Sequence, residues 1–126
     1  MSPVRVVIAN PTQDLPPSLL LRFKRHPLSL ATVDAPVGLW ETVPRLRAQL
    51  AVVDLELISF AELNKLCREF PETAFVCIHR LADDFIWSQS LAAGAVDCCL
   101  PSDLPHILEN AERYIALKHA DAVSAA

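Results

Sequence analysis

Glycine is scarce in this chain, since only Gly38 and Gly94 occur among its 126 residues. A glycine-rich loop that could cradle phosphate groups is therefore missing, and nucleotide-binding folds that depend on such a loop are disfavoured. No apolar run approaches the roughly 18 residues that a membrane-spanning helix needs, so we expect no such span. The first residues also lack the basic-then-apolar layout of a signal peptide, and we expect a cytoplasmic protein.

Basic residues are fewer than acidic ones. The chain has 11 lysines and arginines against 15 aspartates and glutamates, which gives a net charge of −4 and a pI near 5.5. We therefore expect no direct binding to nucleic acid and none to an anionic membrane. Hydrophobic residues make up 52% of the chain and charged residues 21%, which is typical of a folded globular domain. We expect one domain over residues 1–119 and a frayed tail over residues 120–126.

Four cysteines are present, but no two of them have the C-x-x-C spacing of a redox or zinc motif. Three of them lie within apolar segments, which is typical of small buried hydrophobic residues in a reducing compartment. A weaker alternative is a thiol or metal sensor. Its ligands would be Cys77, His79, Cys98 and Cys99, which would have to converge from neighbouring strands.

Strand-like apolar segments alternate along the chain with segments of helical periodicity. The strand candidates cover residues 4–9, 28–33, 50–54, 74–78 and 96–100. Helical segments are expected after each strand, beginning near residues 14, 39, 59, 83 and 102. Five strands that are each followed by a helix predict a parallel sheet with helices on both faces, which is a doubly wound, three-layer αβα fold.

Asp54 is the residue that first suggests a functional site. It closes the apolar segment 50–54, and because a buried carboxylate is costly, such a residue normally faces a polar pocket at a strand tip. Ligands of open parallel sheets bind beside the carboxyl ends of the strands. Asp54, His79 and the Asn10-Pro11 turn all fall at such ends, so we expect a site there.

Three segments, in this order, resemble the receiver domains of response regulators. Residues 5–9 resemble the first receiver strand, and residues 51–55 resemble the strand that bears the phospho-accepting aspartate. Residues 91–97 resemble the alanine-glycine-alanine turn that leads into the fifth receiver strand. The resemblance covers almost the whole chain. It implies a CheY-like, flavodoxin-like fold and a role in two-component signal transduction, and not an enzyme.

The other residues of the receiver site are replaced in this chain. Receivers hold Mg²⁺ with two acidic residues after the first strand, and here Asn10 and Pro11 stand in their place. The lysine that follows the fifth receiver strand is replaced by the pair Leu100 and Pro101, and the switch hydroxyl by His79. The resemblance therefore implies absent or weak Mg²⁺ binding and no other cofactor.

These replacements favour a vestigial role for Asp54, because metal and lysine neutralise the oxygens of a transferring phosphoryl group. Its structural role would be to accept hydrogen bonds from loop N–H groups or to pair with His79. The favoured hypothesis is an atypical receiver, or pseudo-receiver, that acts through phosphorylation-independent protein contacts. The alternative is a conventional receiver in a phosphorelay, with Asp54 as the acceptor and with bound Mg²⁺.

A candidate partner surface lies on the predicted helix at residues 83–93. A helix cannot bury three consecutive large apolar side chains, so at least one of Phe85, Ile86 and Trp87 should be exposed. We select Phe85 and Trp87 as candidate contact residues. The resemblance implies that the fourth helix, the fifth strand and the last helix bind a protein partner or form a homodimer.

Overall fold

The computed structural model describes residues 3–11 and 28–124. Within these ranges the strands are β1 (Val4–Ala9), β2 (Leu28–Val33), β3 (Leu50–Asp54), β4 (Ala74–Ile78) and β5 (Asp97–Cys99). The helices are α2 (Pro36–Leu46), α3 (Phe60–Glu69), α4 (Asp84–Ala93), the short 3₁₀ helix η2 (Pro101–Asp103), α5 (Leu104–Glu109) and α6 (Ala111–Ser124). The helix expected from residue 14 lies outside the described residues.

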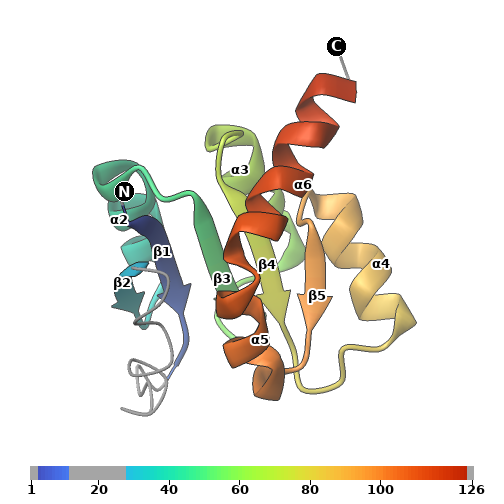
Figure 1. The fold of residues 1–126 in the computed structure, drawn as a ribbon. Helices are drawn as coiled ribbons and strands as arrows, with labels where there is room; N and C mark the ends of the chain where they lie inside the picture. The colour runs from blue at the N-terminus through green and yellow to red at the C-terminus, as the bar shows by residue number, and fades with distance from the viewer. Residues whose placement is uncertain (1–2, 12–27, 125–126) are drawn as a thin grey trace.

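All five strands form one parallel sheet in the order β2-β1-β3-β4-β5 (Figure 1). The predicted parallel sheet and the doubly wound fold class are thereby confirmed. In this order the topological switch point, where the strand order reverses, lies between the adjacent strands β1 and β3. The tips of β1 and β3 thus lie next to each other at the carboxyl edge of the sheet.

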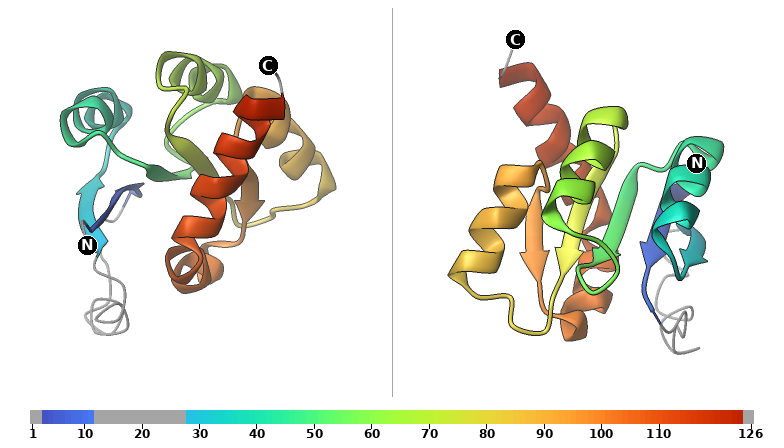
Figure 2. Two further views of the ribbon diagram at one scale, coloured as in Figure 1. Left: turned by 45° about the horizontal axis from the view of Figure 1, so that its top comes forward. Right: turned by 180° about the vertical axis from the view of Figure 1, so that it is seen from behind.

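Two hydrophobic clusters cover the two faces of the sheet. On one face α2, α3 and α4 pack against the side chains of residues such as Val53 and Phe75, and on the other α5 and α6 pack against residues such as Val52 and Val76. Figure 2 shows this division, with α2, α3 and α4 over the face opposite α6. Strand residues alternate between the clusters because successive strand side chains point to opposite faces.

Helix ends follow signals that the sequence carries. The N-cap Ser59 accepts a hydrogen bond from the N–H of Glu62, and Asp83 accepts one from Ile86 at the start of α4. Residues 59–62 have the sequence of a capping box, and only this half of the box is present. The Glu62 carboxylate instead accepts the indole N–H of Trp40 at 2.7 Å, which ties α3 to α2.

The C-terminal helical segment is less regular than its periodicity predicts. It is divided into η2, α5 and α6, with the break at Asn110. The Asn110 side-chain amide donates to the carbonyl of His106 at 2.8 Å, and the backbone N–H of Asn110 donates to the same carbonyl at 3.0 Å. Beyond the expected domain end at residue 119, α6 continues to Ser124; the fraying of the tail stays a prediction. In the part of the chain that the structure describes, no helix is long and apolar enough to cross a membrane.

Candidate functional site

The candidate site lies at the carboxyl edge of the sheet, where β1, β3, β4 and β5 end. Residue pairing places Ala9 beside Val53 and Asp54 beside Ile78. Asn10 therefore follows β1 next to Asp54, and His79 follows β4 on the other side of it. The sequence placed these three residues at strand tips, and the structure confirms that placement.

Asp54 is buried, with 8% of its surface exposed. One carboxylate oxygen, Oδ1, accepts the backbone N–H of Glu56 at 2.8 Å, and the Asp54 carbonyl accepts the N–H of Leu57 at 3.0 Å. These bonds close a tight turn between β3 and α3. The predicted structural role of Asp54, as an acceptor for loop N–H groups, is therefore present in the molecule.

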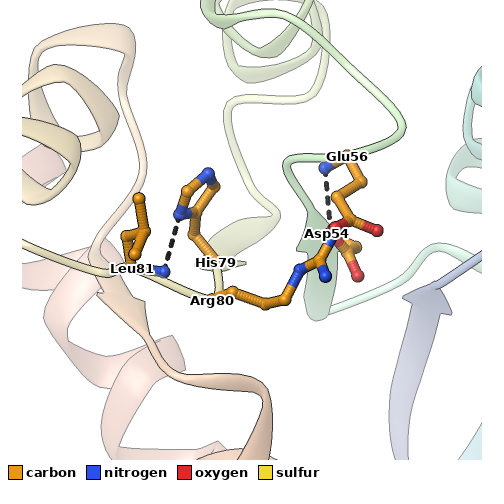
Figure 3. Close-up of polar contacts among 5 residues, drawn as sticks. All are labelled: Asp54, Glu56, His79, Arg80 and Leu81. Carbon is orange, nitrogen blue, oxygen red and sulfur yellow. Dashed lines mark hydrogen bonds and ion pairs between the residues drawn. The ribbon is translucent and has the colours of Figure 1, made fainter.

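An ion pair lies across the mouth of this turn. The guanidinium of Arg80 contacts the carboxylate of Glu56, so the loop after β4 is joined to the turn after β3. Figure 3 shows the Arg80 side chain extended toward the turn that holds Asp54 and Glu56. Both partners are solvent-exposed, so the pair contributes roughly 0–1 kcal/mol to the free energy of unfolding. The Glu56 carboxylate is therefore already paired with a cation of the protein, Arg80.

His79 is turned away from Asp54. Its ring atom Nδ1 accepts the N–H of Leu81 at 3.0 Å, and its backbone N–H donates to the carbonyl of Cys99 at 3.0 Å. Figure 3 shows the imidazole beside Leu81 and pointing away from the Asp54 turn. The alternative in which His79 pairs with Asp54 is therefore wrong for this arrangement, because the loop N–H has taken the place of the carboxylate.

The other four residues that were predicted to line the pocket lie at the same edge of the sheet. The N–H of Asn10 donates to the carbonyl of Val33 at 3.0 Å, and Pro11 is exposed in the turn that follows. After β5, Leu100 is exposed and Pro101 opens η2, whose Asp103 carboxylate accepts the Leu100 N–H at 3.2 Å. None of these four positions supplies a carboxylate or an ammonium group to the Asp54 turn.

Among the described residues, the carboxylates of the Asp54 turn already have partners within the protein. Mg²⁺ prefers an octahedron of hard oxygens that includes one or more free carboxylates. Of the two carboxylates on the turn, that of Asp54 accepts a backbone N–H and that of Glu56 is paired with Arg80. Across residues 3–11 and 28–124, no three His, Cys, Asp or Glu side chains are grouped so that they could hold a metal ion.

The cysteines lie on both faces of the sheet, which corrects the four-ligand sensor hypothesis. Cys77 and Cys98 belong to the cluster under α3 and α4, whereas Cys99 packs with the cluster under α5 and α6. Since Cys98 and Cys99 are consecutive strand residues, their side chains must point to opposite faces. The two thiols and His79 therefore do not converge on one site.

Burial keeps these thiols protonated. It raises the pKa of Cys67 to about 11 and that of Cys77 further, and the pKa of Cys98 also rises. For Cys99, burial and then the neighbouring Asp97 carboxylate raise the pKa to about 12. A reactive sensor cysteine needs a lowered pKa and access to solvent, so the sensor alternative is disfavoured on both counts.

We expect the folded protein to react slowly with a thiol reagent near neutral pH. Because burial and the Asp97 carboxylate raise the pKa of Cys99 to about 12, its thiolate fraction near neutral pH is far below that of an ordinary cysteine. The measurement is the labelling rate of the folded protein against that of the same protein in denaturant, where all four thiols should react at once. Rapid labelling of one thiol in the folded state would contradict the conclusion that the thiols are protonated and unreactive, and would support the thiol-sensor hypothesis.

A polar network that the sequence did not predict lies at the edge strand β5. The Asp97 carboxylate accepts hydrogen bonds from the indole N–H of Trp87 at 3.3 Å and from the Tyr114 hydroxyl at 3.2 Å, and it also accepts the N–H of Cys98 and the thiol of Cys99. Burial, followed by the nearby Cys99 and Asp97, raises the pKa of Tyr114. The network joins α4, β5 and α6, and an aspartate at the start of an apolar strand was the only sequence signal for it.

The predicted exposure of the α4 aromatics is confirmed. Phe85 and Trp87 are exposed, whereas Ile86 packs against the cluster between the sheet and α4. Trp87 is held by Asp97, so its ring lies over the edge strand. The structure thus places two exposed aromatic side chains on α4, and one of them, Trp87, is bonded to β5.

No protein-family model and no curated protein sequence matches the chain. Solved structures do match it. A CheY-like response regulator receiver domain from Methanospirillum hungatei JF-1 is 16% identical, with a TM-score of 0.77 over 95% of this chain and 99% of that one. The signal receiver domain of a putative Luxo repressor protein from Vibrio parahaemolyticus is 14% identical, with a TM-score of 0.77 over 98% of both chains.

A response regulator from Thermotoga maritima is 19% identical to this chain, with a TM-score of 0.75 over 92% of this chain and 99% of the other. At such identities the likeness concerns the backbone, and it extends over nearly the full length of both partners. The strand order 2-1-3-4-5 agrees with it. The chain therefore has the fold of response-regulator receiver domains.

Proposed function

We propose that the chain is an atypical receiver domain that takes part in signal transduction through protein contacts and without phosphoryl transfer. The observation that carries the proposal is the composition of the Asp54 turn. Asp54 occupies the acceptor position of the receiver fold, but Asn10 and Pro11 flank it and Leu100 and Pro101 follow β5. In this proposal the module is not an enzyme and has weak Mg²⁺ binding or none.

The shortage of positive charge near Asp54 argues against efficient phosphoryl transfer to it. A transferring phosphoryl group spreads negative charge over its oxygens, and catalysis consists mainly of neutralising that charge with fixed cations. Among the described residues, the cation that contacts this turn is Arg80, which is exposed and paired with Glu56. An unassisted carboxylate would have to approach an anionic phosphoryl donor against electrostatic repulsion.

Signalling by contact requires a surface, and α4 with β5 offers one. Phe85 and Trp87 are exposed there, and the Asp97 network fixes Trp87 in place. Exposed aromatic side chains with restricted freedom are favoured anchors of protein interfaces. A protein partner is therefore proposed for this surface; a homodimer through α4, β5 and α6 is the other arrangement that the receiver resemblance implies.

The test is incubation of the folded protein with acetyl phosphate and Mg²⁺, and separately with beryllium fluoride and Mg²⁺. We expect no added phosphoryl group by intact mass and no metal-dependent shift of the Asp54 region in two-dimensional NMR spectra. The variant Asp54→Asn, which lacks the acceptor oxygen, is the control for non-specific modification. Modification of the wild type that needs Mg²⁺ and is lost in Asp54→Asn would replace the proposal by a conventional phospho-accepting receiver.

A further inference from the structure

An open cavity of about 910 Å³ lies at the amino edge of the sheet, opposite the edge that holds Asp54. It is lined by the start of β1, by the turn from α2 to β3, by the turn from α3 to β4 and, on the α6 side, by His119. In Figure 1 the strand arrows point away from this upper edge, and the end of α6 extends past it. Sites for small molecules have volumes of about 300–1,000 Å³, so this cavity can hold one.

Arg5 supplies a cation to the wall of this cavity. It interrupts an otherwise apolar strand, and strand alternation places it on the same face of the sheet as Val7 and Ala9. Its Nε atom donates to the carbonyl of Arg47 at 3.0 Å, which holds the guanidinium beside the end of α2. Among the described residues no carboxylate forms an ion pair with Arg5, so the outer N–H groups of its guanidinium are available to an anion.

Arg47 supplies a second cation to the same cavity, from a position that usually holds glycine. It ends α2 in the left-handed region at φ 50°, and its N–H donates to the carbonyl of Pro44 at 3.2 Å. Helices that end in this way commonly have glycine there, because a side chain is strained in the left-handed region. Strained residues of this kind cluster at ligand-binding sites. The helix end gives no reason for an arginine, whereas the cavity that its side chain lines does.

The other walls of the cavity indicate which kind of anion fits. Val43, Ala48 and Phe70 give it an apolar wall against which an apolar or aromatic group can pack. Glu69 and Glu72 also line it, and among the described residues neither forms an ion pair. Their charges would repel a ligand with several negative groups, such as a nucleotide, so a single carboxylate is the favoured anion.

We propose that this cavity binds a small organic monocarboxylate that carries an apolar or aromatic body. Arg5 and Arg47 would hold the carboxylate, because a planar guanidinium can donate two parallel hydrogen bonds to it. The body of the ligand would pack against Val43 and Phe70. The site lies at the edge of the sheet opposite Asp54, so the inference goes beyond the proposed function and does not depend on it.

The test is an NMR titration of the wild-type protein with benzoate, phenylacetate and 4-phenylbutyrate, whose carboxylates lie at different distances from the ring. We expect at least one of these probes to bind, with amide shifts centred on residues 47–49 and 70–73. The amide of the same probe keeps the ring and loses the charge, so it should bind at least about fivefold more weakly. Inorganic phosphate has charge but no apolar body, and it should also bind at least about fivefold more weakly.

The variant Arg47→Gly separates binding from folding. It removes the guanidinium, keeps the backbone carbonyl that accepts Arg5, and relieves the strain at φ 50°. We expect a urea midpoint equal to or above that of the wild type, together with carboxylate binding that is about tenfold weaker. Arg45→Gln is the matched control, because Arg45 is exposed on α2, does not line the cavity and changes the net charge equally. It should change the affinity less than about twofold.

Each of several results would overturn this inference: no binding of any of the carboxylates, equal binding of the matched amide or of phosphate, or an affinity that Arg47→Gly leaves unchanged. Shifts centred on the turn at Asp54 would place the ligand at the other edge of the sheet and overturn it too. None of these results bears on the proposed function, which the phosphorylation experiment on Asp54 tests separately.

Discussion

Rebuilding the acidic pair and the lysine around Asp54 should make the chain accept a phosphoryl group from acetyl phosphate in a Mg²⁺-dependent reaction. The variant carries Asn10→Asp, Pro11→Asp and Pro101→Lys. We expect a rate at least about 100-fold above that of the wild type, because a single preorganised electrostatic group in an active site is worth about 10²–10³ in rate. Intact mass followed over time, with and without Mg²⁺, measures the gain.

The control is the same variant with Asp54→Asn, which should lose the gain completely. A second form with Leu100→Lys in place of Pro101→Lys covers the other residue at the end of β5. Circular dichroism checks that each variant is folded, because Pro101 opens η2 and its removal could loosen that turn. If both folded forms stay unmodified, the missing acids and lysine do not explain why Asp54 is not phosphorylated. The Arg80–Glu56 pair would then be the next group to remove.

The sheet could be predicted from the sequence because its three central strands are largely buried on both faces. Residues 4–9, 50–54 and 74–78 are largely apolar runs, and residues 28–33 alternate apolar with small or polar residues; the four strands have those bounds in the structure. The fifth strand was expected over residues 96–100 and pairs only over Asp97–Cys99. As an edge strand it has one neighbour, β4, so pairing and not composition sets its ends.

The C-terminal helical segment shows where periodicity alone is insufficient. Apolar residues recur through it at helical spacing, and that spacing persists on both sides of Asn110. At the break the Asn110 side-chain amide bonds to the carbonyl of His106, which also accepts the backbone N–H of Asn110. A local bond of this kind leaves the hydrophobic pattern unchanged, so the pattern could not indicate it.

The candidate site could be predicted only in part. Asp54 and the replaced positions follow from strand ends and from the receiver resemblance, and the structure places them at one edge of the sheet. The contacts of Glu56 with Arg80, of Asp97 with Trp87 and Tyr114, and of Glu62 with Trp40 could not be predicted, because they join residues 10 to 24 positions apart in sequence. Such contacts depend on how helices pack across the sheet, and no local pattern encodes them.

Replacing Gly94 by valine should cost about 3 kcal/mol of the free energy of unfolding. Gly94 ends α4 in the left-handed region at φ +116°, where a side chain is strained by roughly 1–2 kcal/mol. A Cβ atom there would also lie 2.8 Å from the Cβ of Cys67 on α3, and overpacking of this kind costs about 1–3 kcal/mol. Urea unfolding, followed by circular dichroism, gives the difference from the wild type.

Ala92→Val is the matched control, because Ala92 is exposed on the same helix and the change should cost only about 0.7 kcal/mol of helix propensity. A Gly94→Val protein within about 0.5 kcal/mol of the wild type would contradict the close approach of α3 and α4, since the strain and the overpacking both exceed that margin. The result bears on function as well. The turn at Gly94 connects α4 to β5, so the packing that the valine would disturb is the packing that holds Trp87 beside the edge strand.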